Sequence, residues 1–121
     1  MISKRTPYYV YQATIRRWVD GDTVDVDIDL GFGIIYHNQR IRLWGIDAPE
    51  SRTRDLTEKA LGKEAKRFAE GYAPEGTIVQ LQTQKDDKGK FGRILGVIIV
   101  NETINLNLLM ISEGHAKKYE E

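Results

Sequence analysis

Hydrophobic and polar residues alternate along the first third of the chain in the way that half-buried β-strands require. In residues 23–30, TVDVDIDL, aspartates occupy one face and the other face consists of Val24, Val26, Ile28 and Leu30. Residues 8–20 are rich in β-branched and aromatic side chains, and residues 34–46, IIYHNQRIRLWGI, form a third run after the GFG turn. The pattern predicts a meander of three strands that Pro49 ends, because proline cannot donate to a strand ladder.

The spacing of the apolar residues becomes helical after this proline. Asp55, followed by Glu58, resembles a capping box, and a helix is predicted over about residues 56–72, with apolar positions Leu56, Ala60, Leu61, Ala65, Phe68, Ala69 and Tyr72. Two more strands are predicted over residues 77–84 and 93–101, on either side of the polar turn KDDKGKFG. A last short helix, about residues 104–113, is expected to bury Ile104, Leu108 and Ile111 and to end at Gly114.

This order of elements predicts an α+β fold. Five strands with a helix between the third and the fourth is the order of the OB-fold, so we expect a five-stranded OB-fold β-barrel with two or three packed α-helices. The length of 121 residues, with 40% hydrophobic and 30% charged residues, suits a single domain over residues 1–121. Barrels of this type host many activities, so the fold class alone does not establish a function.

Composition excludes several classes of protein. The chain has no cysteine, which rules out a disulfide framework and a thiolate metal site. It shows neither a secretory signal nor an apolar run of about 18 residues, so no membrane association is expected. We expect a cytoplasmic protein, or a secreted one if Met1 replaces a removed leader. Since 18 basic residues balance 18 acidic ones, any affinity for nucleic acid must come from local placement of charge.

Charge is placed unevenly between residues 20 and 54. Residues 20–29 hold five aspartates and no basic residue, and the following stretch is rich in arginine: Arg40, Arg42, Arg52 and Arg54. This segregation suits a metal ion beside an anion site, and it equally suits a solvated acidic strand face followed by an unrelated basic one. The motif VDGDT at residues 19–23 has the same two interpretations. It is either a tight Asp-Gly turn or a pair of carboxylates, Asp20 and Asp22, held at a strand end for a hard cation.

The segment RLWGIDAPE at residues 42–50 places charges among apolar residues. Asp47 follows an apolar run and precedes a proline, so its carboxylate is expected at a barrel rim. Glu50 is of the type that serves as a general base, or it is simply an acid at a helix start. Arg42 on a strand needs an anionic partner, and Arg93 supplies a second guanidinium. Together the two arginines suit a phosphoryl group, whereas either one alone favours a structural ion pair.

At this point the residues match a known family. The motifs V-DGDT, R-L-x-G-I-D-x-P-E, G-R before an apolar strand, and N-L…EG-A near the end resemble the staphylococcal nuclease (thermonuclease) family over about residues 10–118. The resemblance implies a calcium-dependent nuclease that hydrolyses phosphodiester bonds of DNA and RNA, mainly single-stranded. It also implies that activated water attacks phosphorus and that 3′-phosphate ends are left. We expect a monomer.

The resemblance also implies roles for individual residues. Asp22 and Asp47 look like the Ca²⁺ ligands, together with the backbone carbonyl of Ala48, where many members of the family have threonine. Asp20 looks like an outer residue that supports them. Glu50 looks like the family's general base. Arg42 and Arg93 look like the two arginines that bind the scissile phosphate and its transition state. Lys90 and Phe91 look like a basic-aromatic pair that contacts a nucleotide phosphate and base. Tyr119 does not align clearly with the tyrosines that follow in other members.

Two other functions compete with the nuclease. One is a non-catalytic OB-fold module that binds nucleic acid or protein, which predicts that a catalytic residue is missing, and none is missing here. The other is an adaptor protein in which the acids and arginines form ion pairs at the barrel rim, which the balanced net charge permits.

Overall fold

The structure is a computed structural model that describes residues 9–84 and 94–120. The described strands are β1 (Val10–Asp20), β2 (Thr23–Gly31), β3 (Ile34–Leu43), β4 (Ile46–Asp47), β5 (Ile78–Gln84), β6 (Ile94–Val100), β7 (Ile104–Asn105) and β8 (Lys117–Lys118). The described helices are α1 (Leu56–Tyr72) and α2 (Leu106–Ser112). Within these ranges, neither helix is long and apolar enough to cross a membrane.

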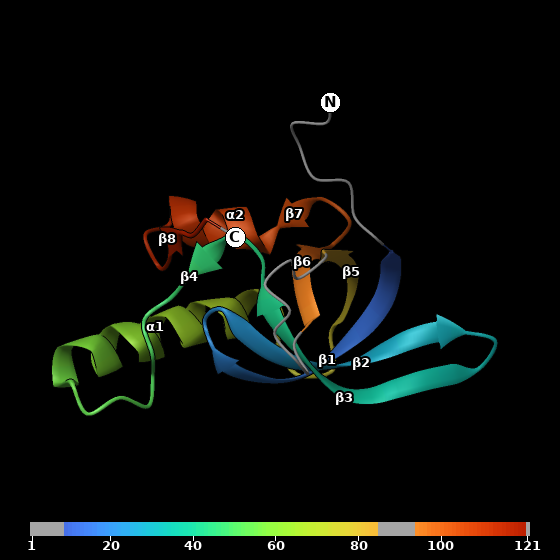
Figure 1. Ribbon diagram of the computed structural model, residues 1–121, viewed down its shortest axis with the longest axis horizontal. Helices are drawn as coiled ribbons and strands as arrows, with labels where there is room; N and C mark the ends of the chain where they lie inside the picture. The colour runs from blue at the N-terminus through green and yellow to red at the C-terminus, as the bar shows by residue number, and fades with distance from the viewer. Residues whose placement is uncertain (1–8, 85–93, 121) are drawn as a thin grey trace.

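Five of the strands form a closed barrel. The main sheet has the order β3-β2-β1-β5-β6-β7, and β3 also pairs in parallel with β6 through residues 41–43, which joins its ends. Helix α1 packs beside β1, α2 packs against β6, and the β2–β3 hairpin extends away from α1 (Figure 1). The expected α+β barrel of the OB-fold type is therefore confirmed.

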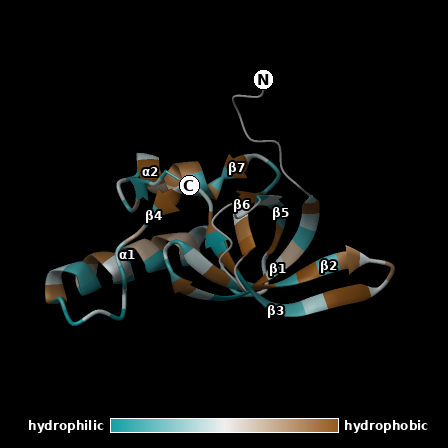
Figure 2. Cartoon of the chain, in the orientation of Figure 1, coloured by the Kyte–Doolittle hydropathy of each residue, from teal (hydrophilic) through white to brown (hydrophobic). Residues whose placement is uncertain are grey.

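The core follows the predicted alternation in β2 with one exception. Val24, Val26 and Ile28 are buried, but Leu30 is 42% exposed and the prediction for it is wrong. The reason is the length of the hairpin: β1 pairs with β2 only as far as Asp29, so Leu30 lies beyond the barrel. Figure 2 shows hydrophobic residues at this projecting end of the hairpin.

The predicted third strand is divided into two. It stops at Leu43, and the chain turns through Gly45, whose φ of +82° is a left-handed conformation that glycine adopts without strain. The chain then forms the two-residue strand β4, which pairs with β8 near the C-terminus. Asp47 is therefore carried by a separate short strand and not by the long one that contains Arg42.

Helix α1 has the predicted bounds, and its capping box is half formed. The Asp55 carboxylate accepts hydrogen bonds from the backbone N–H groups of Thr57 and Glu58, as an N-cap should. The Glu58 carboxylate does not return to Asp55; it accepts a 3.1 Å bond from the N–H of Glu50. The N-terminus of the helix thus holds the loop that precedes it.

The buried faces of both helices differ in part from the prediction. In α1, Gly62, Ala65 and Ala69 are buried, whereas the larger apolar residues Leu56, Leu61 and Tyr72 stay at least 40% exposed. Helix α2 is shorter than expected; Leu106 and Met110 are its buried apolar residues, and the prediction that Leu108 is buried is wrong, because it is 62% exposed. Gly114 ends the helix region as predicted, with a φ of +80°.

Candidate metal and phosphate site

Asp22 lies in the turn between β1 and β2 and is only 7% exposed. Its carboxylate accepts hydrogen bonds from the Thr23 hydroxyl at 2.9 Å and from the backbone N–H of Ala48 at 2.8 Å. The second bond joins the first turn of the barrel to the loop that follows β4. Two segments that are far apart in the sequence therefore meet at one rim.

Arg42 connects Asp22 to Asp47 at this rim. Its Nη1 atom lies 3.5 Å from Oδ2 of Asp22, and its Nη2 atom lies 3.5 Å from Oδ1 of Asp47. The guanidinium also donates to the backbone carbonyls of Ile46, at 2.8 Å, and Leu43, at 3.2 Å. The three charged residues are thus gathered in one place, with Arg42 and Asp22 largely buried and Asp47 57% exposed.

Glu50 lies in a loop that the two carboxylates of VDGDT hold at both ends. Asp22 binds Ala48 at one end, and Asp20 accepts bonds from the N–H of Ser51, at 3.0 Å, and from its hydroxyl, at 2.6 Å, at the other. The side chain of Glu50 is exposed between these anchors. The structure therefore places Asp20 as a support for the loop.

Gly62 lets α1 approach this loop closely. The sequence pattern did not predict this role. A Cβ atom at this position would lie 2.3 Å from the carbonyl oxygen of Glu50 and 2.6 Å from the backbone nitrogen of Ser51. No side chain fits there unless the loop or the helix moves. The available signal was an isolated glycine inside a helical pattern, which often marks close packing.

Asn107 is a second residue whose role was missed. This buried side chain accepts a bond from the N–H of Ile98 and donates to the carbonyls of Trp44 and Gly96. It thereby fixes the turn between β3 and β4 to β6 and α2. A buried polar group with three partners in a small barrel holds the position of Asp47 indirectly.

The aspartates within β2 belong to the barrel surface and not to the rim. Asp25 pairs with Arg40 and Arg17, and the Arg40 guanidinium holds the pKa of the Asp25 carboxyl below its usual value. The N–H of Asn38 is the main cause that lowers the pKa of Asp27. Asp25 and Asp27 are therefore not a solvated face beside an unrelated basic stretch: their side chains are 16% and 15% exposed and form ion pairs with neighbouring arginines.

Three predicted site residues lie outside the described residues: Arg93, Lys90 and Phe91. The first described residue after them is Ile94, which starts β6 and pairs with Ile41, the neighbour of Arg42.

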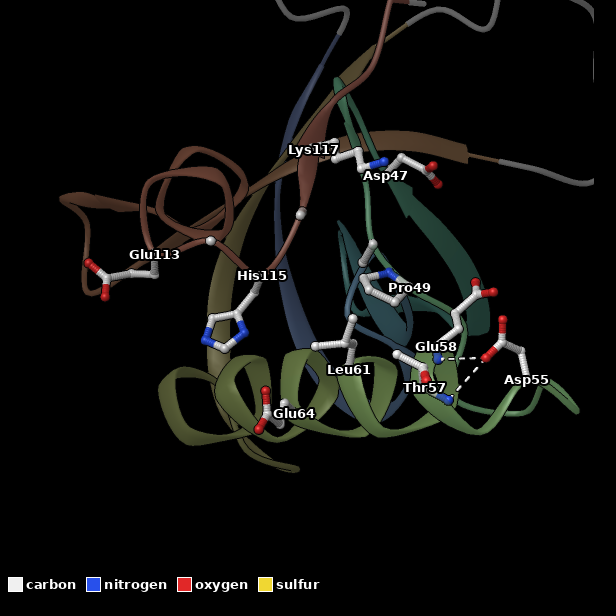
Figure 3. Close-up of a pocket in the computed structure, with 13 residues that line it drawn as sticks. Asp47, Pro49, Asp55, Thr57, Glu58, Leu61, Glu64, Glu113, His115 and Lys117 are labelled. Carbon is white, nitrogen blue, oxygen red and sulfur yellow. Dashed lines mark hydrogen bonds between the residues drawn. The ribbon is translucent and has the colours of Figure 1, made fainter.

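A pocket of about 700 Å³ lies on the side of Asp47 that faces α1 (Figure 3). Asp47 and Lys117 border it above and Leu61 lies at its base, and its other acids are Asp55, Glu58, Glu64 and Glu113. This excess of carboxylates repels phosphate. An anionic ligand would approach the rim from the side of Arg42 and not through this pocket.

The donor atoms at the rim suit a hard divalent cation. Among the described residues, no group of three or more acidic, histidine or cysteine side chains gathers to hold a metal. Asp22 and Asp47 offer carboxylate oxygens, and the hydrogen bond to Asp22 keeps the Ala48 peptide beside them. Oxygen ligands completed by water are what Ca²⁺ and Mg²⁺ accept. The residues present fit such an ion.

The fold and this rim together define a class: an OB-fold barrel that gathers two aspartates and an arginine where β2 begins and β3 ends. A family comparison agrees with this class. The chain belongs to the family described as staphylococcal nuclease homologue, whose model matches residues 40–121.

Individual relatives are similar over most of this chain. A thermonuclease of Staphylococcus intermedius is 28% identical over 103 residues, which are 85% of this chain and 56% of the relative. The uncharacterized protein MJ1439 of Methanocaldococcus jannaschii is 31% identical over 90% of this chain and 59% of its own length. The endonuclease YhcR of Bacillus subtilis is 26% identical over 90% of this chain and 9% of its own length. The chain thus spans little more than half of the first two and a small part of the third.

Proposed function

We propose that this protein is a metal-dependent nuclease that hydrolyses phosphodiester bonds of DNA and RNA, preferentially single-stranded, and acts as a monomer. The observation that carries the proposal is the meeting of Asp22, Asp47 and Arg42 at one rim, beside the loop that presents Glu50. Membership of the staphylococcal nuclease homologue family supports it, as do relatives named thermonuclease and endonuclease.

Asp22, Asp47 and the carbonyl oxygen of Ala48 would hold the divalent cation, which we propose to be Ca²⁺. When bound, this ion would neutralise part of the charge that develops on the phosphoryl oxygens. Alanine at position 48 keeps the carbonyl and lacks the threonine hydroxyl that the family resemblance implies at this position. Because the N–H of Ala48 already binds Asp22, the backbone at this position stays oriented without that hydroxyl.

Glu50 would act as the general base. Its exposed carboxylate can reach water, while Glu58 and Asp20 hold the backbone on its two sides. Glu50 would accept a proton as the water oxygen bonds to phosphorus. The P–O5′ bond then breaks, the 5′ oxygen takes a proton, and the products are a 3′-phosphate and a 5′-hydroxyl.

Arg42 and Arg93 would stabilise the transition state. Arg42 uses its Nη1 donors on the carbonyls of Leu43 and Ile46, which fixes the plane of the guanidinium and leaves other N–H groups for phosphate oxygens. Lys90 and Phe91 would contact a neighbouring phosphate and base, since an aromatic face stacks on any base. Tight duplex binding by charge alone is not expected from a chain with balanced charge.

A cleavage assay tests this function. The protein is incubated with heat-denatured DNA, with Ca²⁺ and then with excess chelator, and compared with Glu50→Ser and Arg93→Ala. Glu75→Ser and Arg67→Ala serve as controls, because both side chains are exposed and away from the rim. We expect chelator-sensitive cleavage that both site variants lose and both controls keep. Binding of DNA without cleavage by the folded wild type would instead support the non-catalytic module.

A further inference from the structure

The last described residues fold back onto the short strand that carries Asp47. In the pairing of β8 with β4, Lys117 lies opposite Asp47 and Lys118 lies opposite Ile46. The ladder continues by a 2.8 Å hydrogen bond from the N–H of Tyr119 to the carbonyl of Gly45, and β8 lies beside β4 (Figure 1). Each strand is only two residues long, so this C-terminal segment helps to place β4, together with Arg42 and helix α2.

The ring of Tyr119 lies over the guanidinium of Arg42. The Cζ atom of Arg42 is 5.7 Å from the ring centroid, within the range of a cation–π contact. The same guanidinium donates to the carbonyl of Ile46, the β4 residue that lies opposite Lys118 of β8. The C-terminal segment therefore contacts Arg42 both directly through a ring and indirectly through the backbone of β4.

Burial distinguishes Arg42 from the arginines farther along the same barrel face. Its side chain is 17% exposed, against 51% for Arg40 and 67% for Arg17. An arginine side chain loses much rotamer freedom when it is held in one position, and a cation–π contact is stronger when the cation is partly desolvated. A ring at this position can therefore keep the guanidinium oriented before substrate arrives.

We propose that Tyr119 is a positioning residue that holds Arg42 in the orientation needed to meet the scissile phosphate between Asp22 and Asp47. The proposal rests on the proposed function for the role of Arg42, but the contact itself does not. The positioning is assigned to the aromatic ring of Tyr119 and not to its hydroxyl group. Tyr119→Phe therefore preserves the positioning of Arg42. Tyr119→Leu removes it, although the variant keeps an apolar side chain and the backbone N–H.

The test compares these two variants with Tyr72→Leu, a matched control because Tyr72 has the same 40% exposed fraction and lies on α1. The first readout is the ¹⁵N order parameter of the Arg42 Nε–H group, measured by NMR without substrate. We expect it to fall in Tyr119→Leu and to keep the wild-type value in Tyr119→Phe and Tyr72→Leu. An unchanged order parameter in Tyr119→Leu, or an equal fall in Tyr119→Phe, would overturn the proposal.

The second readout is the cleavage rate on single-stranded DNA. In Tyr119→Leu we expect kcat to fall by about fivefold to tenfold, with a smaller change in KM, and Tyr119→Phe to restore it. A merely structural role would lower the amount of folded protein and leave both constants per folded molecule unchanged, which would also overturn the proposal. If the wild type cleaves nothing while the order parameter responds as expected, the proposed function fails and the positioning of Arg42 by Tyr119 stands.

Discussion

Replacing Gly62 with alanine adds a methyl group between α1 and the loop that carries Glu50. The new Cβ atom would lie 2.3 Å from the carbonyl oxygen of Glu50, whereas ordinary contacts begin near 3.4 Å. Helix and loop must therefore separate by about 1 Å. The loop cannot yield freely, because Asp20 and Asp22 hold it at both ends.

Two opposed effects set the change in the free energy of unfolding of Gly62→Ala. Crowding of this kind costs about 1 to 3 kcal/mol, and glycine to alanine inside a helix returns up to about 1 kcal/mol. We therefore expect a net loss of about 0 to 2 kcal/mol in the free energy of unfolding. Activity is more sensitive than stability, since a displacement of about 1 Å at a catalytic group can lower a rate about a hundredfold.

The assay measures kcat on heat-denatured DNA and the free energy of unfolding in urea for the same preparations. Gly71→Ala is the control, because it lies on the same helix and a Cβ atom there meets nothing within 4 Å. It should keep full activity and gain about 0.5 kcal/mol of stability. A wild-type kcat in Gly62→Ala would show that close packing of α1 does not position Glu50.

Three further changes have distinct expected outcomes. Asn107→Ala removes the acceptor of the buried Ile98 N–H and one donor from each of the Trp44 and Gly96 carbonyls, and should lower the free energy of unfolding by about 2 to 3 kcal/mol in urea titration. A loss no larger than that of Asn101→Ala, at an exposed asparagine, would contradict it. Because Arg40 lowers the pKa of the Asp25 carboxyl, the stability that this pair adds is present above the usual pKa of 3.8 and is lost as pH falls through the lower pKa of the folded state. Asp25→Asn should therefore reduce the fall in the free energy of unfolding at acid pH. An unchanged fall would refute the coupling between Asp25 and Arg40. Phe32→Asn should stabilise by about 0.5 kcal/mol, since Phe32 is fully exposed with a φ of +58° that asparagine tolerates better, and should leave kcat unchanged.

The sequence predicted the elements whose periodicity continues over many residues. Alternation in β2 and helical spacing over residues 56–72 reflect local geometry, so both were predicted closely. Leu30 and Leu108 were predicted wrongly because burial depends on what lies opposite, and the hairpin end and the outer face of α2 have no covering element among the described residues. Periodicity identifies an apolar face but not the length over which it is covered.

The candidate site shows a second limit of what the sequence pattern can predict. Five aspartates between residues 20 and 29 look alike in the sequence, yet Asp20 and Asp22 hold the Glu50 loop while Asp25 bonds Arg40. The difference is set by strand register, which places Asp25 opposite Arg40 and brings Thr23 opposite Arg42. The role of Gly62 was also not predicted, because its close contact with Glu50 depends on where α1 packs in three dimensions.

In the mechanism we propose, water attacks phosphorus at the rim formed by Asp22, Asp47 and Arg42. The most direct test is cleavage of a single-stranded oligonucleotide in H₂¹⁸O with Ca²⁺, followed by mass spectrometry of the products. We expect one ¹⁸O atom in a 3′-phosphate and none in the 5′-hydroxyl, with no product from Glu50→Gln. Label in the hydroxyl, 5′-phosphate ends, or equal product from Glu50→Gln would contradict it.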